Sequence, residues 1–122
     1  MFRLTVCDSF EAAHHLDGYV GKCANTHGHS YKVEVHFLAE NLDDLGLGCD
    51  FAVLRDKLKQ VMDPLDHQYL NKLTCFEGVN PSAENIAKYI FETLSKNNDL
   101  PNISVHEVAI KETDHYAATY KK

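Results

Sequence analysis

The sequence has little positive charge. Twelve lysines and arginines stand against eighteen aspartates and glutamates, which gives a formal net charge of −6. Only Arg3 and Arg55 are arginines. A protein that binds nucleic acid needs a basic patch to neutralise phosphates, and no such cluster stands out here. We therefore expect no nucleic-acid partner, and any anionic ligand must be held by local charges.

Long apolar runs are also missing. No stretch approaches the roughly 20 residues that a membrane-spanning helix needs. The residues from Met1 to Thr5 do not open a basic region followed by an apolar run, as a secretory signal would. The four cysteines are Cys7, Cys23, Cys49 and Cys75. They form no Cys-x-x-Cys pair, so we interpret them as free thiols and expect a cytoplasmic protein without a membrane partner.

The overall composition is typical of a folded globular chain, with 44% hydrophobic and 25% charged residues in a length of 122. A chain of this length buries roughly two-thirds of the surface that its unfolded form exposes, which is enough for one modest core. No linker, internal repeat or low-complexity tract divides it. We expect a single domain spanning residues 1–122.

The segment Cys23–Tyr31 holds a thiol and two imidazoles in a short space. From Ser30 onward apolar and polar residues alternate, which is typical of a half-buried strand. His27 and His29 fall on the same parity as the apolar residues, so their rings would leave one face about 7 Å apart at Cα. Two neutral imidazoles at this spacing can bind one metal ion. They can equally be hydrogen-bonded or solvated side chains at the end of a strand.

His14 can supply a third ligand. It ends a segment in which Phe2, Leu4, Val6, Phe10 and Ala12 share its parity. If this first strand pairs antiparallel with the second, His14 faces the same pocket as the other two histidines. Three protein ligands leave one position open, as in a catalytic rather than a structural zinc site. His15 and His36 lack the right parity, and we expect them at the surface or behind the ligands.

The remaining pattern predicts two helices and two further strands. Residues 16–26 form a loop, and Asp50 is a plausible N-cap for a helix that Pro64 limits. Asn80, as N-cap before Pro81 in the first turn, predicts the start of a second helix, which ends near residues 96–99. Alternation returns over residues 108–120.

The order is therefore strand, strand, helix, helix, strand, strand. It predicts an α+β fold with a four-stranded antiparallel sheet and both helices on one face. The other face and both edges of the sheet remain uncovered. Because exposed edges are normally paired or shortened, we expect a homo-oligomer that continues the sheet into a larger barrel.

Two acidic positions raise further possibilities. Asp66 and His67 lie in the link between the helices, where such a pair is either plain surface or a proton-transfer unit. Glu112 continues the apolar parity of Val108 and Ile110. A carboxylate there either sits at a solvated strand end or pairs with a ligand rich in hydrogen-bond donors.

Together these segments resemble the 6-pyruvoyltetrahydropterin synthase family from end to end. The resemblance is carried by Phe10-Glu11-Ala12-Ala13-His14, Cys23-x-x-x-His27-Gly28-His29, Leu65-Asp66-His67, Asn80-Pro81-Ser82-Ala83-Glu84-Asn85 and Lys111-Glu112-Thr113. The three residues between Cys23 and His27 look like the 6-carboxytetrahydropterin synthase branch, which supplies queuosine and other 7-deazapurines. The pyruvoyl-forming branch usually has a longer spacer.

The resemblance implies a tunnelling fold (T-fold), in which subunits assemble into barrels with active sites at their interfaces. For this chain it implies a homo-oligomer, as a hexamer built from two trimers. It also implies Zn²⁺ as the metal. The family's zinc ligands fall on His14, His27 and His29.

The resemblance also assigns catalytic and substrate-binding residues. The family's catalytic cysteine falls on Cys23, and its Asp-His pair falls on Asp66 and His67. Glu112 matches the glutamate that anchors the pterin, where a carboxylate accepts two parallel N–H bonds from the ring. The chain departs from its relatives at Ser82-Ala83, where they often carry a threonine or a second hydroxyl residue.

The implied reaction is a zinc-dependent lyase reaction. It converts 7,8-dihydroneopterin triphosphate to 6-carboxy-5,6,7,8-tetrahydropterin, acetaldehyde and triphosphate. One alternative is a pyruvoyl-forming or aldolase-like relative with the same residues. Another, of a different class, is a zinc-binding or pterin-binding module without turnover, although such a module needs no base and no proton relay.

Overall fold

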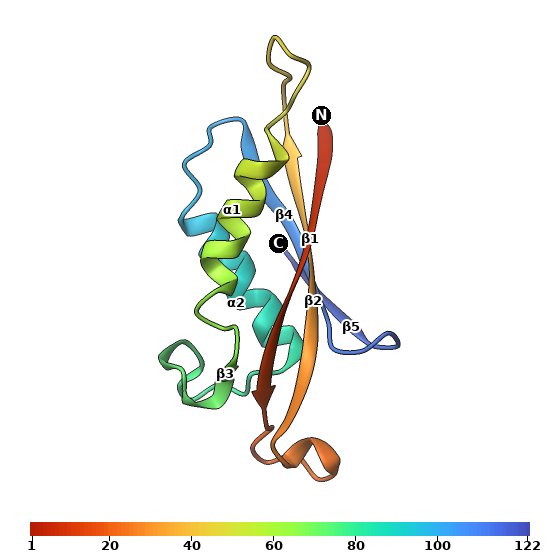
Figure 1. The fold of residues 1–122 in the computed structure, drawn as a ribbon, viewed down its shortest axis with the longest axis vertical. Coiled ribbons are helices and arrows are strands. Elements are labelled where there is room, and N and C mark those ends of the chain that lie inside the picture. Colours follow the sequence, from red (N-terminus) through yellow and green to blue (C-terminus); the bar gives the residue numbers. More distant parts are fainter.

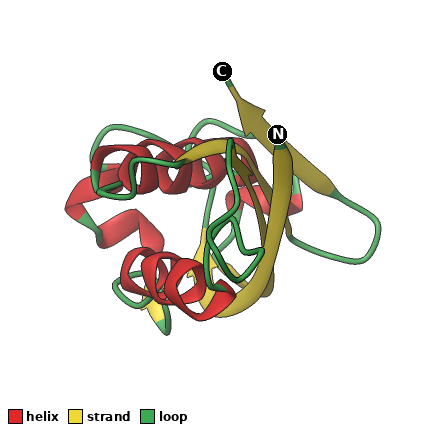
Figure 2. Cartoon of the chain, turned by 90° about the horizontal axis from the view of Figure 1, so that it is seen from above, coloured by secondary structure: helices red, strands yellow, loops and turns green.

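The computed structural model describes residues 1–122 throughout. The strands are β1 (Phe2–His14), β2 (His27–Ala39), β3 (Gln68–Tyr69), β4 (Ile103–Lys111) and β5 (Ala117–Lys121). The helices are α1 (Phe51–Met62) and α2 (Ala83–Lys96), with single 3₁₀ turns η1 (Lys22–Ala24), η2 (Leu70–Lys72) and η3 (Thr74–Phe76). Figure 1 shows both α-helices along one side of the strands, and Figure 2 shows the same arrangement from above.

The two long strands β1 and β2 form the centre of the fold. They pair antiparallel over their full length, from Phe2 opposite Ala39 to His14 opposite His27. β4 pairs antiparallel with the other edge of β2, and β5 pairs antiparallel with β4. The alternation in the sequence therefore predicted the α+β class and these four strands correctly.

The sheet has one more strand than predicted. β3 pairs parallel with β1, with Gln68 opposite Ala12 and Tyr69 opposite Ala13. The sheet is therefore five-stranded and mixed, in the order β3-β1-β2-β4-β5, rather than four-stranded and antiparallel. A strand of two residues is too short to show any alternation, so the sequence could not reveal it.

The core lies between the helices and one face of the sheet. Its buried side chains come from alternate positions of β1, β2 and β4 and from the apolar stripes of α1 and α2, including Val6, Phe10, Val33, Val35, Leu54, Leu58, Ile86, Ile90, Val108 and Ile110. On the opposite face, positions such as Thr5, Lys32 and Glu34 are exposed. Neither helix is long and apolar enough to cross a membrane.

The helix starts are fixed by side-chain caps. Asp50 caps α1 as predicted, because its carboxylate accepts a hydrogen bond from the Ala52 N–H at 2.9 Å. The prediction for α2 was wrong by two residues. Ser82, rather than Asn80, is the N-cap, and its hydroxyl accepts from the Asn85 N–H at 3.2 Å. Asn80 is unavailable for capping because its carboxamide binds the backbone of Asp17.

Candidate functional site

The strand register brings three histidines together at one end of the core face. His14 is the last residue of β1 and lies opposite His27, the first residue of β2. His29 follows two positions along β2, on the same face. The potential ligand atoms of the three side chains all lie within 4.8 Å of one another. His14 is only 1% exposed, so this cluster lies where the hydrophobic core meets the end of the sheet.

Two backbone carbonyls set the orientation and tautomer of two of these rings. The Nδ1 of His14 lies 2.6 Å from the Pro81 carbonyl oxygen, and the Nδ1 of His27 lies 2.7 Å from that of Asn25. A carbonyl oxygen only accepts, so each Nδ1 carries the proton and each neutral ring has a lone pair on Nε2. The two Nε2 atoms are 2.9 Å apart. Two lone pairs at this distance repel each other unless a cation or a proton lies between them.

The third imidazole is also ready to bind a cation. The Nε2 of His29 is buried and has no hydrogen-bond partner. Burial lowers the pKa of His14 and of His29, which favours the neutral form that acts as a metal ligand. Three neutral imidazoles form a donor set suited to zinc and to other first-row transition metals. This structure contains a possible metal site made of His14, His27 and His29.

Glu112 lies beside the same nitrogens. Its Oε1 is 3.9 Å from the Nε2 of His14, and its Oε2 is 3.9 Å from the Nε2 of His29. Its backbone N–H donates to the Tyr116 carbonyl at 3.2 Å, in the turn between β4 and β5. A cavity of about 400 Å³ borders Glu112 and His29. Glu112 therefore stands just past the end of β4, with its carboxylate beside the buried imidazole nitrogens of His14 and His29.

Cys23 lies in η1, within the loop between β1 and β2. Its carbonyl oxygen accepts a hydrogen bond from the Leu16 N–H at 2.9 Å. Leu16 follows His14 by two residues, so this bond brings the cysteine segment back to the end of β1. The side chain of Cys23 is partly buried. The loop thus places a thiol-bearing residue next to the segment that carries His14.

Asp66 and His67 form a pair at the edge of β1, just before β3. The Asp66 carboxylate accepts from the Glu11 N–H at 2.9 Å and from the His67 Nδ1 at 3.0 Å. These hydrogen bonds, the one from Glu11 foremost, hold the pKa of Asp66 below its ordinary value. His67 has a positive φ of 58°, which is uncommon for a residue other than glycine.

No hydrogen bond joins the Asp66–His67 pair to the histidine cluster within one chain. The His67 side chain is 77% exposed. The polar contacts of the pair link the two residues to each other, to Glu11 and to the end of α1 at Met62 and Asp63, and none reaches Cys23 or the three histidines. A cavity of about 620 Å³ borders both His67 and His29. The pair is therefore exposed to a ligand or to another protein surface.

Several groups in the site were not predicted. Asn25 and Pro81 act through main-chain carbonyls, which have no signature in the side-chain sequence. Tyr31 was predicted only as an apolar strand residue, but its ring packs edge-on against His14 and His29, with centroids 5.7 and 5.3 Å apart. Its hydroxyl is buried without a partner. The parity that Tyr31 shares with the two histidines on β2 was the signal that could have placed it in the site.

Comparison with known proteins matches residues 3–122 to the family described as 6-pyruvoyl tetrahydropterin synthase. The chain belongs to this family. A 6-carboxy-5,6,7,8-tetrahydropterin synthase of Synechocystis is 38% identical over 117 residues, covering 92% of this chain and 87% of the relative. A Haemophilus influenzae protein of the same name is 33% identical, covering 93% of this chain and 94% of the relative.

Solved structures give the same result. The structure of a Caenorhabditis elegans 6-pyruvoyl tetrahydropterin synthase has a TM-score of 0.87 and 32% identity, covering 99% of this chain and 95% of the other. A Plasmodium vivax 6-pyruvoyltetrahydropterin synthase has a TM-score of 0.77 at 24% identity, covering 99% and 97% of the two chains. The T-fold expected from the sequence is therefore confirmed for this member of the 6-pyruvoyl tetrahydropterin synthase family.

We predict that this member of the family loses metal affinity when one imidazole is removed. His29→Ala should weaken the binding of a divalent metal by more than the 10–100-fold that is typical when a residue only orients a ligand. Titration of chelator-stripped protein with Co²⁺ against a coloured chelator measures this. The matched control is His36→Ala, because His36 binds Thr5 and Glu34 on the outer face. An unchanged affinity in the His29 variant would contradict the assignment.

Proposed function

We propose that the chain is a 6-carboxytetrahydropterin synthase. It converts 7,8-dihydroneopterin triphosphate and one water molecule to 6-carboxy-5,6,7,8-tetrahydropterin with release of acetaldehyde and triphosphate, in the pathway to queuosine and other 7-deazapurines. The observation that carries the proposal is the convergence of three imidazole Nε2 atoms beside the Glu112 carboxylate. The two bacterial relatives of that name support it, as does the spacer of three residues between Cys23 and His27.

Zinc is the metal that we propose for the histidine site. The fit rests on the buried and unpartnered Nε2 of His29 and on the two facing lone pairs of His14 and His27. Three histidines leave a fourth position for an exchangeable ligand. Bound there, zinc would polarise the side-chain oxygens of the substrate and acidify the adjacent C–H bonds.

Four side chains share the remaining roles in the proposed reaction. We assign to Cys23 the removal of a proton from the substrate side chain, because its loop returns to the end of β1 beside the histidine site. His67, oriented by the Asp66 carboxylate, donates or relays a proton at the opposite side of the substrate. Glu112 accepts two N–H bonds from the pterin edge, which fixes the ring next to the histidines.

The active site in this proposal is completed between subunits. Asp66 and His67 make no hydrogen bond to the other site residues of their own chain. The outer face of the sheet and the β5 edge are uncovered within one chain, which favours pairing with another copy. We propose a homo-oligomer, namely a hexamer made of two trimers.

The assembly prediction is tested by light scattering coupled to size exclusion at micromolar protein concentration. We expect a mass several times that of the 13.8 kDa chain, because an uncovered sheet edge is normally paired. A monomer that turns over substrate would contradict this part of the proposal.

The proposed reaction is tested by incubating the zinc-loaded protein with 7,8-dihydroneopterin triphosphate and identifying the products by mass. We expect 6-carboxytetrahydropterin, acetaldehyde and triphosphate. A 6-pyruvoyl product would identify the alternative activity, which the C. elegans relative suggests. Binding of a pterin without any product would favour a non-catalytic binding module.

Variants of Cys23 and Glu112 should separate chemistry from binding. Cys23→Ala should abolish turnover but keep metal and pterin binding, because a proton-transfer group acts mainly in the transition state. Glu112→Ala should weaken pterin binding by about 2 kcal/mol or more, and Glu112→Gln should also fail because an amide offers one acceptor oxygen. Calorimetry with a non-reactive pterin distinguishes the two. The opposite pattern, with binding lost only in Cys23→Ala, would refute this division of roles.

A further inference from the structure

Two asparagine carboxamides hold the chain where it leaves β1. Asn71 accepts a hydrogen bond from the His15 N–H and donates one to the His15 carbonyl, both at 2.9 Å. Asn80 does the same for Asp17, at 2.8 and 3.0 Å. Each carboxamide satisfies both backbone groups of one residue, as the neighbouring strand of a sheet would.

These two contacts extend the pairing of β1 beyond its end. β3 pairs with β1 at Ala12 and Ala13, and the carboxamides then hold His15 and Asp17. Leu16 lies between the two clamped residues, and its N–H donates to the Cys23 carbonyl at 2.9 Å. The peptide that contacts Cys23 is therefore fixed on both sides by asparagine side chains.

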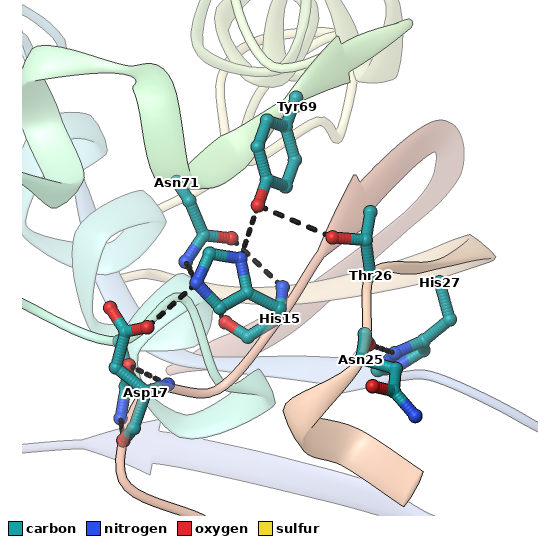
Figure 3. A network of polar contacts seen from close by, with 8 residues as sticks. His15, Asp17, Asn25, Thr26, His27, Tyr69 and Asn71 are labelled. Atoms are coloured by element: carbon teal, nitrogen blue, oxygen red, sulfur yellow. Dashed lines mark hydrogen bonds and ion pairs between the residues drawn. The ribbon is translucent and has the colours of Figure 1, made fainter.

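A polar network ties the other end of the same loop (Figure 3). The His15 ring contacts the Asp17 carboxylate at 2.7 Å through Nε2 and the Tyr69 hydroxyl through Nδ1. The Tyr69 hydroxyl lies 3.4 Å from the hydroxyl of Thr26, which precedes β2. If the Nε2–H donates to Asp17, the Nδ1 accepts from Tyr69. The loop from 16 to 26 is thus tied where it starts and where it ends.

The middle of the loop has little other support. Val20 is 95% exposed and Tyr19 is 54% exposed, so neither packs into the core. Lys22–Ala24 is a single 3₁₀ turn without a side-chain cap. An exposed segment of this kind opens at low free-energy cost unless its ends are held. The position of Cys23 therefore depends on the contacts at residues 15–17.

We propose that Asn71 and Asn80 are positioning residues for the Cys23 loop. Asn80 has a second connection to the site, because the carbonyl of the next residue, Pro81, orients His14. The turn before α2 therefore fixes one histidine of the metal site and the cysteine loop together. The expected effect on turnover rests on the function proposed above, whereas the effect on the loop does not.

The chain contains a matched control at the other end of the sheet. Asn102 accepts from the Asn41 N–H at 2.9 Å and donates to the Asn41 carbonyl at 2.7 Å. These two bonds repeat the contact of Asn71 and Asn80, after β2 has ended rather than after β1, and the Asn102 amide also donates to the Gly48 carbonyl at 3.1 Å. Replacement by aspartate keeps the size of each side chain but turns the amide donor into an oxygen that faces a carbonyl. Asn71→Asp, Asn80→Asp and Asn102→Asp should therefore lower Tm in a similar way.

Only Asn71→Asp and Asn80→Asp should affect the cysteine loop. We expect the Leu16 amide to exchange its hydrogen about tenfold faster or more, because its neighbours are no longer held. Alkylation of Cys23 by iodoacetamide should become faster relative to Cys75, an exposed internal standard. With the proposed substrate, kcat should fall about 10–100-fold with little change in KM and with full metal content, because small misplacements of a reacting group cost rate.

Asn80→Leu serves as the uncharged second variant, because it has a similar size and lacks both hydrogen bonds. If Leu16 exchange and Cys23 alkylation in the Asn71 and Asn80 variants match those of Asn102→Asp, the proposal is overturned. If Leu16 exchange and Cys23 alkylation both become faster while turnover stays at the wild-type rate, the positioning role holds and the catalytic role assigned to Cys23 is wrong. The two hypotheses therefore fail in distinguishable ways.

Discussion

The register of β1 against β2 is the constraint on which the site depends. Side chains alternate between the two faces of a strand, so a shift of one residue would send His27 and His29 to the outer face. The observed pairing places His14 opposite His27 and Ala12 opposite His29. The same register buries Phe10 and Tyr31, whose rings stack with centroids 5.1 Å apart. The hydrophobic pattern that stabilises the fold therefore also assembles the imidazoles.

The cluster is an unfavourable arrangement of polar groups without a cation. Two Nδ1 atoms donate to main-chain carbonyls, which leaves two lone pairs facing each other, and a third imidazole nitrogen is buried without a partner. Buried polar atoms are normally hydrogen-bonded, because leaving one unpaired costs about 1–3 kcal/mol. A metal ion bound by all three nitrogens removes this cost. Binding of a metal ion at this possible site would therefore stabilise the folded chain.

The sequence predicted what alternation and spacing can encode. The three histidines share the parity of the buried strand residues, and this pattern correctly predicted that their side chains lie close together. Asp50 was also correctly predicted as a helix cap. The start of α2 was misjudged because serine and asparagine both cap helices well, and the tertiary contact of Asn80 with Asp17 decides between Ser82 and Asn80. β3 could not be predicted because two residues are too few to show alternation, and the carbonyls of Asn25 and Pro81 could not because backbone groups have no signature in the sequence.

The candidate functional groups gather where the sheet ends, and this location has a physical consequence. His14 closes β1, His27 opens β2 and Glu112 follows β4 by one residue. Strand ends fray, because the last residues of a ladder lack a partner on one side. Rigidity at this end therefore has to come from outside the ladder.

The irregular link between α1 and α2 supplies that rigidity. Asp66 and Asn71 bind the backbone of residues near the end of β1, and Asn80 and the Pro81 carbonyl hold Asp17 and His14. The link contains only β3 and two 3₁₀ turns, yet it ends at the capped start of a helix whose stripe is buried in the core. Because α2 is packed in the core, the residues just before it are held in place, and their hydrogen bonds in turn hold the end of β1. A segment without regular secondary structure can thus be as necessary to the site as the strands that carry its histidines.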